Sequence, residues 1–472
     1  MTFVIFIIAF FSFTGSIWVR HAWFQTNSWD LGIFDQATYL ISKGLTPYST
    51  LLDFHILGDH GALVLYPIGW LSTIFPSVKL LFILQGLALA STVFPLEKLA
   101  KKNNLSKKFT TTSLLVFLLY PVIYNVAIFD FHPEVLAVPL IMEVILLISY
   151  PNPKYYFRIF LCLLFSLTCK ISISFLVIGI GLWLIARKEI NIGLAFVSFA
   201  SAWFLLIGLI LIPYYGGDKA GIARHLDKFG ISNTNIFSLN NLYGNISIIC
   251  KQILSIDNLI YIFLLLIPVI YICFYRERNN TIFNLLPFAP LFFLNLISSI
   301  SPMKDLVHQY SLFLVPFLAS EVQMSLINID KGSFVYPIWF SSRASKIILI
   351  WSILTFMIFS RITFFFGPFQ DRFDSIYYRR EAISKIDSQS AVLTSNDLIP
   401  HLSRRNNIEL TTSDKIDNLD NFDEVLLDKN HPGWSCNTEV VNSIIKILES
   451  NQYWFKKFEK GSIILFSKSS IS

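Results

Sequence analysis

Charged residues are scarce in this chain of 472 residues, and their scarcity excludes an ordinary soluble protein. Asp, Glu, Lys and Arg together make up 14% of the sequence, compared with about 25% in a typical soluble domain. The charges are also clustered, and most of the apolar runs between them are roughly 17 to 25 residues long, enough to cross a hydrocarbon core as helices. The composition therefore predicts a polytopic α-helical membrane protein.

Cysteine is rare as well, and the familiar catalytic motifs are missing. The five cysteines show no paired or metal-type spacing, so we expect small buried side chains rather than redox centres. The sequence contains no P-loop, Gly-rich dinucleotide fingerprint, Cys/His zinc spacing or serine-nucleophile motif. We expect no nucleic-acid partner. The first apolar run lacks a basic leader and a cleavage site, so we interpret it as an uncleaved span.

The distribution of basic residues predicts the topology. The densest basic stretch, from Lys98 to Lys108, is expected in the cytoplasm. Later basic clusters then also fall inside if the short run 61–75 lies in the membrane interface. This predicts about eleven transmembrane helices, with the N-terminus inside and the C-terminus outside. The apolar runs counted are about 2–19, 78–97, 109–128, 134–149, 157–169, 171–186, 191–212, 257–275, 281–300, 306–326 and 346–366.

Composition also divides the chain into two expected domains. Residues 1–371 form the transmembrane domain, whose outer loop 20–77 holds two membrane-lying helices, around 34–42 and 61–75. A second outer loop, 213–256, is long enough for a lid or substrate loop. Residues 372–472 carry more charge and form a small extracytoplasmic α/β domain. In it we expect strands at 391–394, 424–428 and 462–467, and helices at 397–403 and 439–449.

Two carboxylates, Asp30 and Asp35, follow the first apolar run in Ser-Trp-Asp-Leu-Gly-Ile-Phe-Asp-Gln, residues 28–36. Five positions apart on a helix, they face different sides. Asp30 is a candidate general base for an acceptor hydroxyl, or the N-cap of a short helix. Of the two, Asp30 is the stronger catalytic candidate.

Two acidic-histidine groups are expected on the same outer side. Asp59 and His60 precede the run 61–75, and Asp130, His132 and Glu134 lie in Asp-Phe-His-Pro-Glu. Carboxylate and imidazole ligands suit a divalent metal such as Mg, Mn or Zn, or these groups face a phosphate. Helix capping also accounts for Asp130 and Glu134, because Pro133 suits a first helical turn.

Four other residues are candidate substrate or phosphate ligands. Lys170 lies between two apolar runs, either contacting a phosphate or extending to the interface. His308 and Tyr310 begin a later run, where interfacial aromatics are also common. Arg224 lies in the long outer loop and is an anion-binding candidate.

With these motifs in view, the chain resembles a family of bacterial membrane proteins called domain of unknown function 2079. The resemblance rests on Trp29 to Gln36, on Gly58-Asp59-His60 before Leu65-Tyr66-Pro67, and on Phe129 to Glu134. His308-Gln-Tyr310-Ser with Val315-Pro-Phe317, Ser395-Asn-Asp397 and Pro400 to Arg405 add to it. One departure is Lys170-Ile171-Ser172, where the family usually has Lys-Glu-Asp.

The family is in turn similar to the GT-C superfamily of membrane glycosyltransferases. This similarity implies transfer of a sugar from a polyprenyl-phosphate donor to a glycan, lipid or protein acceptor at the outer face of the bacterial cytoplasmic membrane. Asp30 is then the base, Lys170 a phosphate ligand, and Asp59, His60, Asp130, His132 and Glu134 metal- or phosphate-side groups. The alternatives are a transporter or binding protein for a lipid-linked or anionic solute, and a non-catalytic envelope assembly factor.

Overall fold

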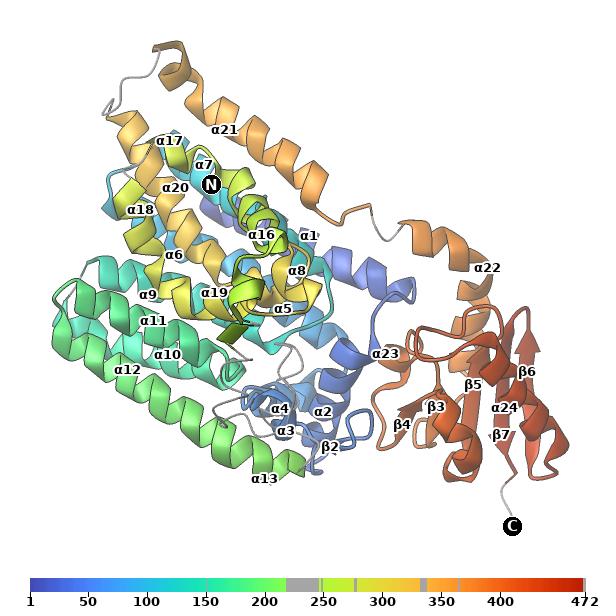
Figure 1. Ribbon diagram of the computed structural model, residues 1–472. Coiled ribbons are helices and arrows are strands. Elements are labelled where there is room, and N and C mark those ends of the chain that lie inside the picture. Colours follow the sequence, from blue (N-terminus) through green and yellow to red (C-terminus); the bar gives the residue numbers. More distant parts are fainter. Residues whose placement is uncertain are drawn as a thin grey trace. The chain divides into compact units, whose positions relative to one another are not determined.

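A computed structural model describes residues 1–150, 152–217, 246–247, 249–275, 278–331, 338–363 and 366–469 (Figure 1). The chain divides into two compact units, each built from separate stretches. Unit 1 comprises Met1–Gly15, Leu57–Val64 and Ile83–Ile362; unit 2 comprises Ser16–Ile56, Leu65–Phe82 and Thr363–Ser472. Residues 20–77, the predicted outer loop, are thus divided between the units, and most of them group with the C-terminal residues.

Unit 1 is helical. Helices α1 and α5 continue from it into unit 2, and short 3-10 or π segments interrupt several of the other helices. Its α-helices are α1 (Thr2–Ala22), α3 (Leu57–His60), α5 (Lys79–Ser91), α6 (Val93–Lys102), α7 (Lys107–Leu118), α8 (Pro121–Ile128), α9 (Val138–Ser149), α10 (Tyr156–Cys169), α11 (Ile173–Ala186), α12 (Ile190–Leu205), α13 (Ile212–Gly216), α16 (Ile256–Leu266), α17 (Ile272–Tyr275), α18 (Arg278–Leu285), α19 (Ala289–Leu296), α20 (Leu314–Asp330) and α21 (Ile338–Phe359).

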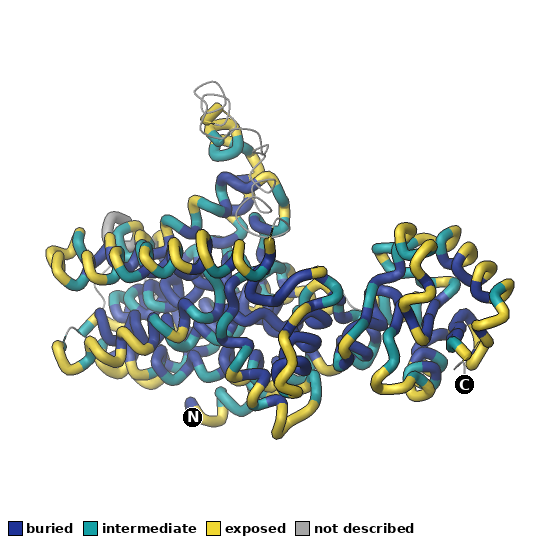
Figure 2. Tube along the Cα trace, turned by 90° about the horizontal axis from the view of Figure 1, so that it is seen from below, coloured by how far each residue is buried: buried dark blue, intermediate teal, exposed yellow. Residues whose placement is uncertain are grey.

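Several helices of the described residues are long and apolar enough to cross a membrane. Three meet both conditions: Thr2–Ala22, Lys79–Lys102 and Ile190–Gly216. In the first and the third, only 22% of the apolar stretch of 18 residues that would cross the membrane is buried. Lys107–Leu118 and Pro121–Ile128 make a fourth if their 48° bend lies within one span. Helix α1 exposes large apolar side chains such as Phe3, Ile8 and Phe11, and Figure 2 shows many exposed residues along the helices, as expected for apolar surface that faces lipid rather than water. The predicted count of eleven spans and the predicted orientation stay predictions.

Proline accounts for several breaks within the predicted apolar runs. Pro121 begins α8 and ends the continuous helix of run 109–128, because proline lacks the amide that an uninterrupted helix needs. Pro133 similarly begins a 3-10 segment, η2 (Pro133–Ala137), before α9. Run 306–326 becomes α-helical only at Leu314, after a short 3-10 segment, η10 (Gln309–Ser311). These breaks leave non-helical backbone at the ends of apolar helices, where polar groups are found.

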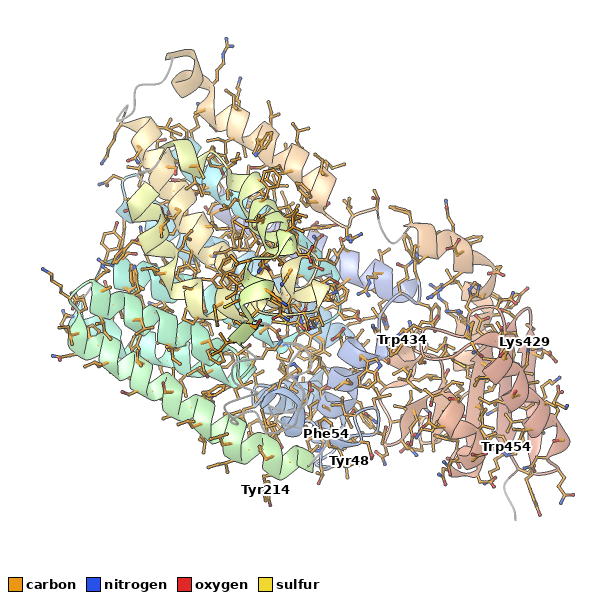
Figure 3. The ribbon with its side chains drawn as sticks, viewed as in Figure 1. Tyr48, Phe54, Tyr214, Lys429, Trp434 and Trp454 are labelled. Atoms are coloured by element: carbon orange, nitrogen blue, oxygen red, sulfur yellow. The ribbon has the colours of Figure 1, made fainter. Side chains whose placement is uncertain are left out.

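In unit 2, the N-terminal stretches contain the helices expected in the outer loop. A π-helical turn, η1 (Ser28–Gly32), leads into α2 (Ile33–Ser42), and α4 (Leu65–Ile74) packs against α2. Helix α2 matches its predicted range of 34–42, whereas α4 begins four residues later than the predicted range of 61–75. The two are so close that a Cβ on Gly69 would lie 2.5 Å from the Ile41 side chain, which explains the glycine. A small hairpin, β1 (Tyr48–Ser49) and β2 (Phe54–His55), carries Tyr48 and Phe54 (Figure 3).

The C-terminal residues form an α/β domain around a five-stranded sheet with the order β4-β3-β5-β7-β6. Strand β3 is parallel to β4 and β5, whereas β7 is antiparallel to β5 and β6. The predicted strands at 391–394, 424–428 and 462–467 and the helix at 439–449 are confirmed; the helix expected at 397–403 is only four residues long. The elements are α22 (Phe366–Ile383), β3 (Val392–Thr394), α23 (Ile399–Leu402), β4 (Ile408–Leu410), β5 (Glu424–Asp428), α24 (Thr438–Ser450), β6 (Trp454–Lys460) and β7 (Ile463–Lys468).

Both faces of this sheet are covered. Alternate residues of β5 point to opposite faces, so Leu426 joins one apolar cluster and Val425 the other. The first cluster includes side chains of α22, α23 and the outer loop, among them Phe24. The second is closed by α24. Burial on both faces explains why the central strands are continuous apolar runs in the sequence.

Candidate functional site

The most buried charged pair of unit 1 that we describe joins two predicted site residues, Lys170 and Glu134. Lys170 follows the last residue of α10 and has extended backbone, while Glu134 lies in η2. The Lys170 Nζ is 2.5 Å from Glu134 Oε1, and the two side chains are 12% and 4% exposed. A buried charge is stable only when it is paired. The pair therefore holds a cation at the end of apolar helices.

Tyr310 lies beside this cation. The Lys170 Nζ is 5.6 Å from the centroid of the Tyr310 ring, a cation–π distance. A buried polar network holds the Tyr310 backbone, because Asn295 Nδ2 donates to the Tyr310 carbonyl at 3.2 Å and to the Tyr261 hydroxyl at 3.0 Å. Asn295 and Tyr261 lie within apolar stretches and were not among the predicted site residues.

The segment with Asp59 and His60 packs against the residues on either side of Lys170. The Ile171 amide donates to the His60 carbonyl at 3.2 Å, and the Val64 amide donates to the Thr168 carbonyl at 3.1 Å. Asp59 contacts the His60 ring and is near enough to interact electrostatically with Lys170. Four predicted residues, Asp59, His60, Glu134 and Lys170, are thus brought together in unit 1.

The Asp-Phe-His-Pro-Glu turn is held by Gln85, which the sequence-based reasoning missed. Gln85 is fully buried, and its Nε2 donates to the carbonyls of Val126, Ala127 and Phe129 at 3.1 to 3.3 Å. Its Oε1 accepts the His132 amide at 3.2 Å. A glutamine within an apolar run was the available signal. It satisfies the carbonyls at the C-terminal end of α8, which have no partner within the helix.

The rings of this turn connect His132 with His308. His132 Nδ1 is 2.8 Å from the Asp130 carbonyl oxygen, and Glu134 interacts electrostatically with His132. The Phe129 ring is 5.9 Å from the His132 ring and 5.5 Å from the His308 ring. His308 is paired with Asp305 at 2.7 Å. All the predicted site residues of unit 1 except Arg224 are described, and Arg224 lies outside the described residues.

The donors of this region do not gather as metal ligands. Among the residues that the structure describes, no three His, Cys, Asp or Glu side chains form a group that could hold a metal ion. Glu134 is paired with a lysine, and His132 Nδ1 faces a backbone carbonyl. The described residues therefore offer no group of metal ligands, so no step below is assigned to a metal, and the predicted divalent cation stays a prediction.

Asp30 belongs to unit 2, where it lies in the π-helical turn η1 and is partly exposed. The turn is anchored at its start. Asn27 Oδ1 accepts the Trp29 amide at 3.1 Å, and Asn396 Oδ1 accepts the Ser28 amide at 3.1 Å and the Ser28 hydroxyl at 2.6 Å. Asn27 is thus the capping residue of this turn. Capping was the alternative role for Asp30, and the structure gives that role to Asn27.

Asp35, the other carboxylate of the motif, is structural. It is buried, and it accepts hydrogen bonds from the Ser403 hydroxyl at 2.7 Å and from Arg404 Nη1 at 2.9 Å. Burial raises the pKa of the Asp35 carboxyl above its ordinary value, although Arg404 and Ser403 oppose the change. Arg404 also donates to Ser72 at 2.9 Å, so one guanidinium joins α2, α4 and the C-terminal domain within unit 2.

A second buried cation of unit 2, Arg379, was not predicted. Its side chain is fully buried and pairs with Asp397 at 2.5 Å and with Asp428 at 2.6 Å. Burial alone would lower the pKa of Arg379, but the attraction of Asp397 and Asp428 raises it. Burial would likewise raise the pKa of Asp397, and the charges of Arg379 and Arg372 bring it below its ordinary value. This network joins α22 to strand β5 and to the loop after β3.

Comparison with known proteins identifies the family of this chain. A model of the family described as "Predicted membrane protein (DUF2079)" matches residues 20–464. The chain belongs to the DUF2079 family. The resemblance inferred from its motifs is thereby confirmed. No curated protein matches the chain.

Among solved structures, the fold of this DUF2079 protein is similar to that of ArnT from Cupriavidus metallidurans. The crystal structure of ArnT bound to undecaprenyl phosphate has a TM-score of 0.59 and 8% identity, over 98% of each chain. The apo ArnT crystal structure has a TM-score of 0.55 and 7% identity, over 94% of this chain and 95% of ArnT. At such low identity the comparison establishes the fold alone, over nearly the whole length of both proteins.

Proposed function

We propose that this protein transfers a sugar from a polyprenyl-phosphate donor to an acceptor at the outer face of a bacterial cytoplasmic membrane. One observation carries the proposal: the buried Lys170, placed by Glu134 and Tyr310, lies at the end of apolar helices in a chain with the fold of ArnT. ArnT has been crystallised with undecaprenyl phosphate. A fixed cation beside lipid-facing helices suits the phosphate of such a lipid.

The chemistry needs few groups. The acceptor oxygen attacks the anomeric carbon of the sugar, and its proton passes to a carboxylate, which we assign to Asp30. The bond from the anomeric carbon to the phosphate oxygen breaks, and its electron pair stays on the departing lipid phosphate. Lys170 stabilises the negative charge that develops there, and a cation already held in place by Glu134 needs little reorganisation.

Binding of the lipid is tested first, with undecaprenyl phosphate as the probe. The full chain is placed in nanodiscs, and retention of the lipid is measured by native mass spectrometry. We expect Lys170→Met to weaken retention roughly tenfold to a hundredfold, the value of a hydrogen bond to a charged group. The control is Lys101→Met, because the Lys101 side chain is 66% exposed and its partner, Glu97, is on the same helix. Equal retention by both variants would contradict the assignment of Lys170.

Transfer is tested separately with Asp30→Asn. Cell-envelope glycans and glycolipids are compared by mass spectrometry between cells that express the wild type and cells that express the variant. We expect the wild-type product to be absent with Asp30→Asn while the amount of folded protein in the membrane is unchanged. Undecaprenyl phosphate binding with no product in either strain would instead favour a transporter or lipid-binding protein, and would contradict glycosyl transfer.

A further inference from the structure

Two exposed tryptophans of unit 2 lie close together although they are far apart in the sequence. Trp29 is 37% exposed and Trp434 is 60% exposed. Their ring centroids are 6.3 Å apart and their planes are inclined by 36°. Trp29 directly precedes Asp30, and Trp434 lies in the loop between β5 and α24 (Figure 3). Together they form an aromatic surface next to the carboxylate assigned as the base.

Each tryptophan is held by backbone that is itself anchored. On one side, Asn396 accepts hydrogen bonds from the amide and hydroxyl of Ser28, at 3.1 and 2.6 Å. On the other, Gly433 has a φ of +85°, and a Cβ there would lie 3.4 Å from the Asn396 amide nitrogen. Asn396 therefore lies between the two aromatic segments, and Gly433 allows the Trp434 loop to approach it.

The start of the Trp434 loop is fixed as well. Asp428 Oδ1 accepts the amides of Asn430 at 3.1 Å and of His431 at 3.2 Å. Asp428 Oδ2 in turn accepts hydrogen bonds from the buried Arg379. The first residues of the loop that carries Trp434 are thus connected through Asp428 to the buried Arg379, and a loop that is anchored in this way loses less entropy when it binds a ligand.

We propose that Trp29 and Trp434 form a sugar-binding surface that holds the acceptor glycan beside Asp30. The face of a pyranose ring presents C–H groups, which are apolar and carry slight positive charge, and the face of an indole carries the complementary negative charge. The hydroxyl groups at the sugar's edge need polar partners, and Asn27, Asp30 and His431 are near the pair in the chain. The acceptor class is then a glycan rather than a free lipid or a peptide.

This inference deepens the proposed function and rests on it for the role of Asp30. Tryptophan is also common at membrane interfaces, so an interfacial anchor is the competing role for these two rings. Two features favour a sugar: the rings lie against each other, and Trp434 belongs to a loop of a charged α/β domain that contains Asn430, His431 and Ser435. An anchor needs neither a fixed pair nor such polar neighbours.

The test uses the full chain in nanodiscs and a printed array of oligosaccharides that includes hexose, N-acetylhexosamine and uronic acid polymers. We expect the wild type to retain at least one class above empty nanodiscs. Trp29→Ala and Trp434→Ala should each weaken that binding about tenfold, as truncating a central aromatic contact does, and Trp434→Phe should keep most of it. Trp70→Ala is the matched control, because Trp70 is 63% exposed and lies on α4 of the same unit.

Three results would each overturn the inference. The first is that the wild type retains no glycan of the array, and the second is that both alanine variants bind as well as the wild type does. The third is that brominated lipids quench a fluorescence component that disappears in Trp434→Ala, which would show an interfacial anchor. The outcome is separable from that of the proposed function. Glycan binding lost in the tryptophan variants, with no transfer in any strain, supports the surface alone, whereas transfer that needs Asp30 but not the tryptophans contradicts it.

Discussion

The Nζ of Lys170 lies 2.5 Å from Oε1 of Glu134, a residue 36 positions earlier in the chain. Glu134 lies in the turn before α9, and Lys170 directly follows α10. The pair therefore connects that turn to the junction of α10 and α11. Neither side chain would be stable alone at this degree of burial. The two residues that follow Lys170, Ile171 and Ser172, carry no charge. Glu134 is therefore the carboxylate that balances Lys170 here.

The first prediction concerns the coupling of this pair. We expect Glu134→Gln to destabilise the folded protein by about 3–5 kcal/mol, because it leaves the buried Lys170 without its counter-charge. Lys170→Met should cost a similar amount, and the double variant should cost clearly less than the sum of the two. Thermal unfolding in nanodiscs measures all three. Additive losses would show that the two residues do not stabilise each other.

The second prediction concerns Gln85. Gln85→Leu removes the donor to three buried carbonyls and the acceptor of the His132 amide, and each buried polar group left unsatisfied costs about 1–3 kcal/mol. We expect a marked fall in the melting temperature together with weaker retention of undecaprenyl phosphate. The comparison is Gln323→Leu, which removes a donor to the single backbone carbonyl of Leu96 and to the Ser113 hydroxyl. A lipid-binding defect as large in Gln323→Leu would contradict the positioning role of Gln85.

The third prediction separates the two carboxylates of the motif. Asp35→Ala removes the carboxylate that pairs with Arg404 and that accepts from the Ser403 hydroxyl, so Arg404 keeps only its bond to Ser72 and Ser403 only a longer bond to the Pro400 carbonyl. It should lower stability by about 3 kcal/mol or more, whereas Asp30→Asn should leave stability within about 0.5 kcal/mol, as partly exposed positions usually do. Unfolding of the full chain measures both changes. A stable Asp35→Ala variant would mean that this ion pair does not hold the segments together.

The fourth prediction is a pH dependence that comes from Asp397. Its pKa is lower in the folded protein than the ordinary value near 4. A depressed carboxyl pKa contributes stability that is fully present above the ordinary value and is lost as the pH falls through the folded value. Melting temperatures measured from pH 7 downward should therefore decrease below about pH 4.

Asp397→Asn should be less stable than the wild type at pH 7, and the difference should shrink as the pH is lowered. Asp371→Asn is the control, because Asp371 lies on α22 and is exposed. A difference between wild type and Asp397→Asn that is constant over the whole range would exclude Asp397 as the source of the acid sensitivity.

Local patterns in the sequence predicted much of this protein. Apolar runs and clustered charge indicated a membrane protein, and the strands β3, β5 and β7 and helix α24 follow from short apolar segments with turn residues between them. Helix α2 is amphipathic, and α4 is a short apolar run that contains Pro67 and Gly69. Lys170 was a candidate because a lone cation between apolar runs is costly. Such features depend on neighbours in the chain, so composition and periodicity are sufficient to detect them.

The partners of the buried charges depended on the tertiary structure. Asp35 and Arg404 are 369 positions apart, and nothing in either local sequence indicates the other. The same is true of Arg379, whose full burial follows from the packing of α22 against the sheet, and of Trp434, which no apolar run contains. The local sequence around a charged residue does not show whether its side chain lies in water or in a core. Only the fold decides which side chains are removed from water, and hence which must be paired.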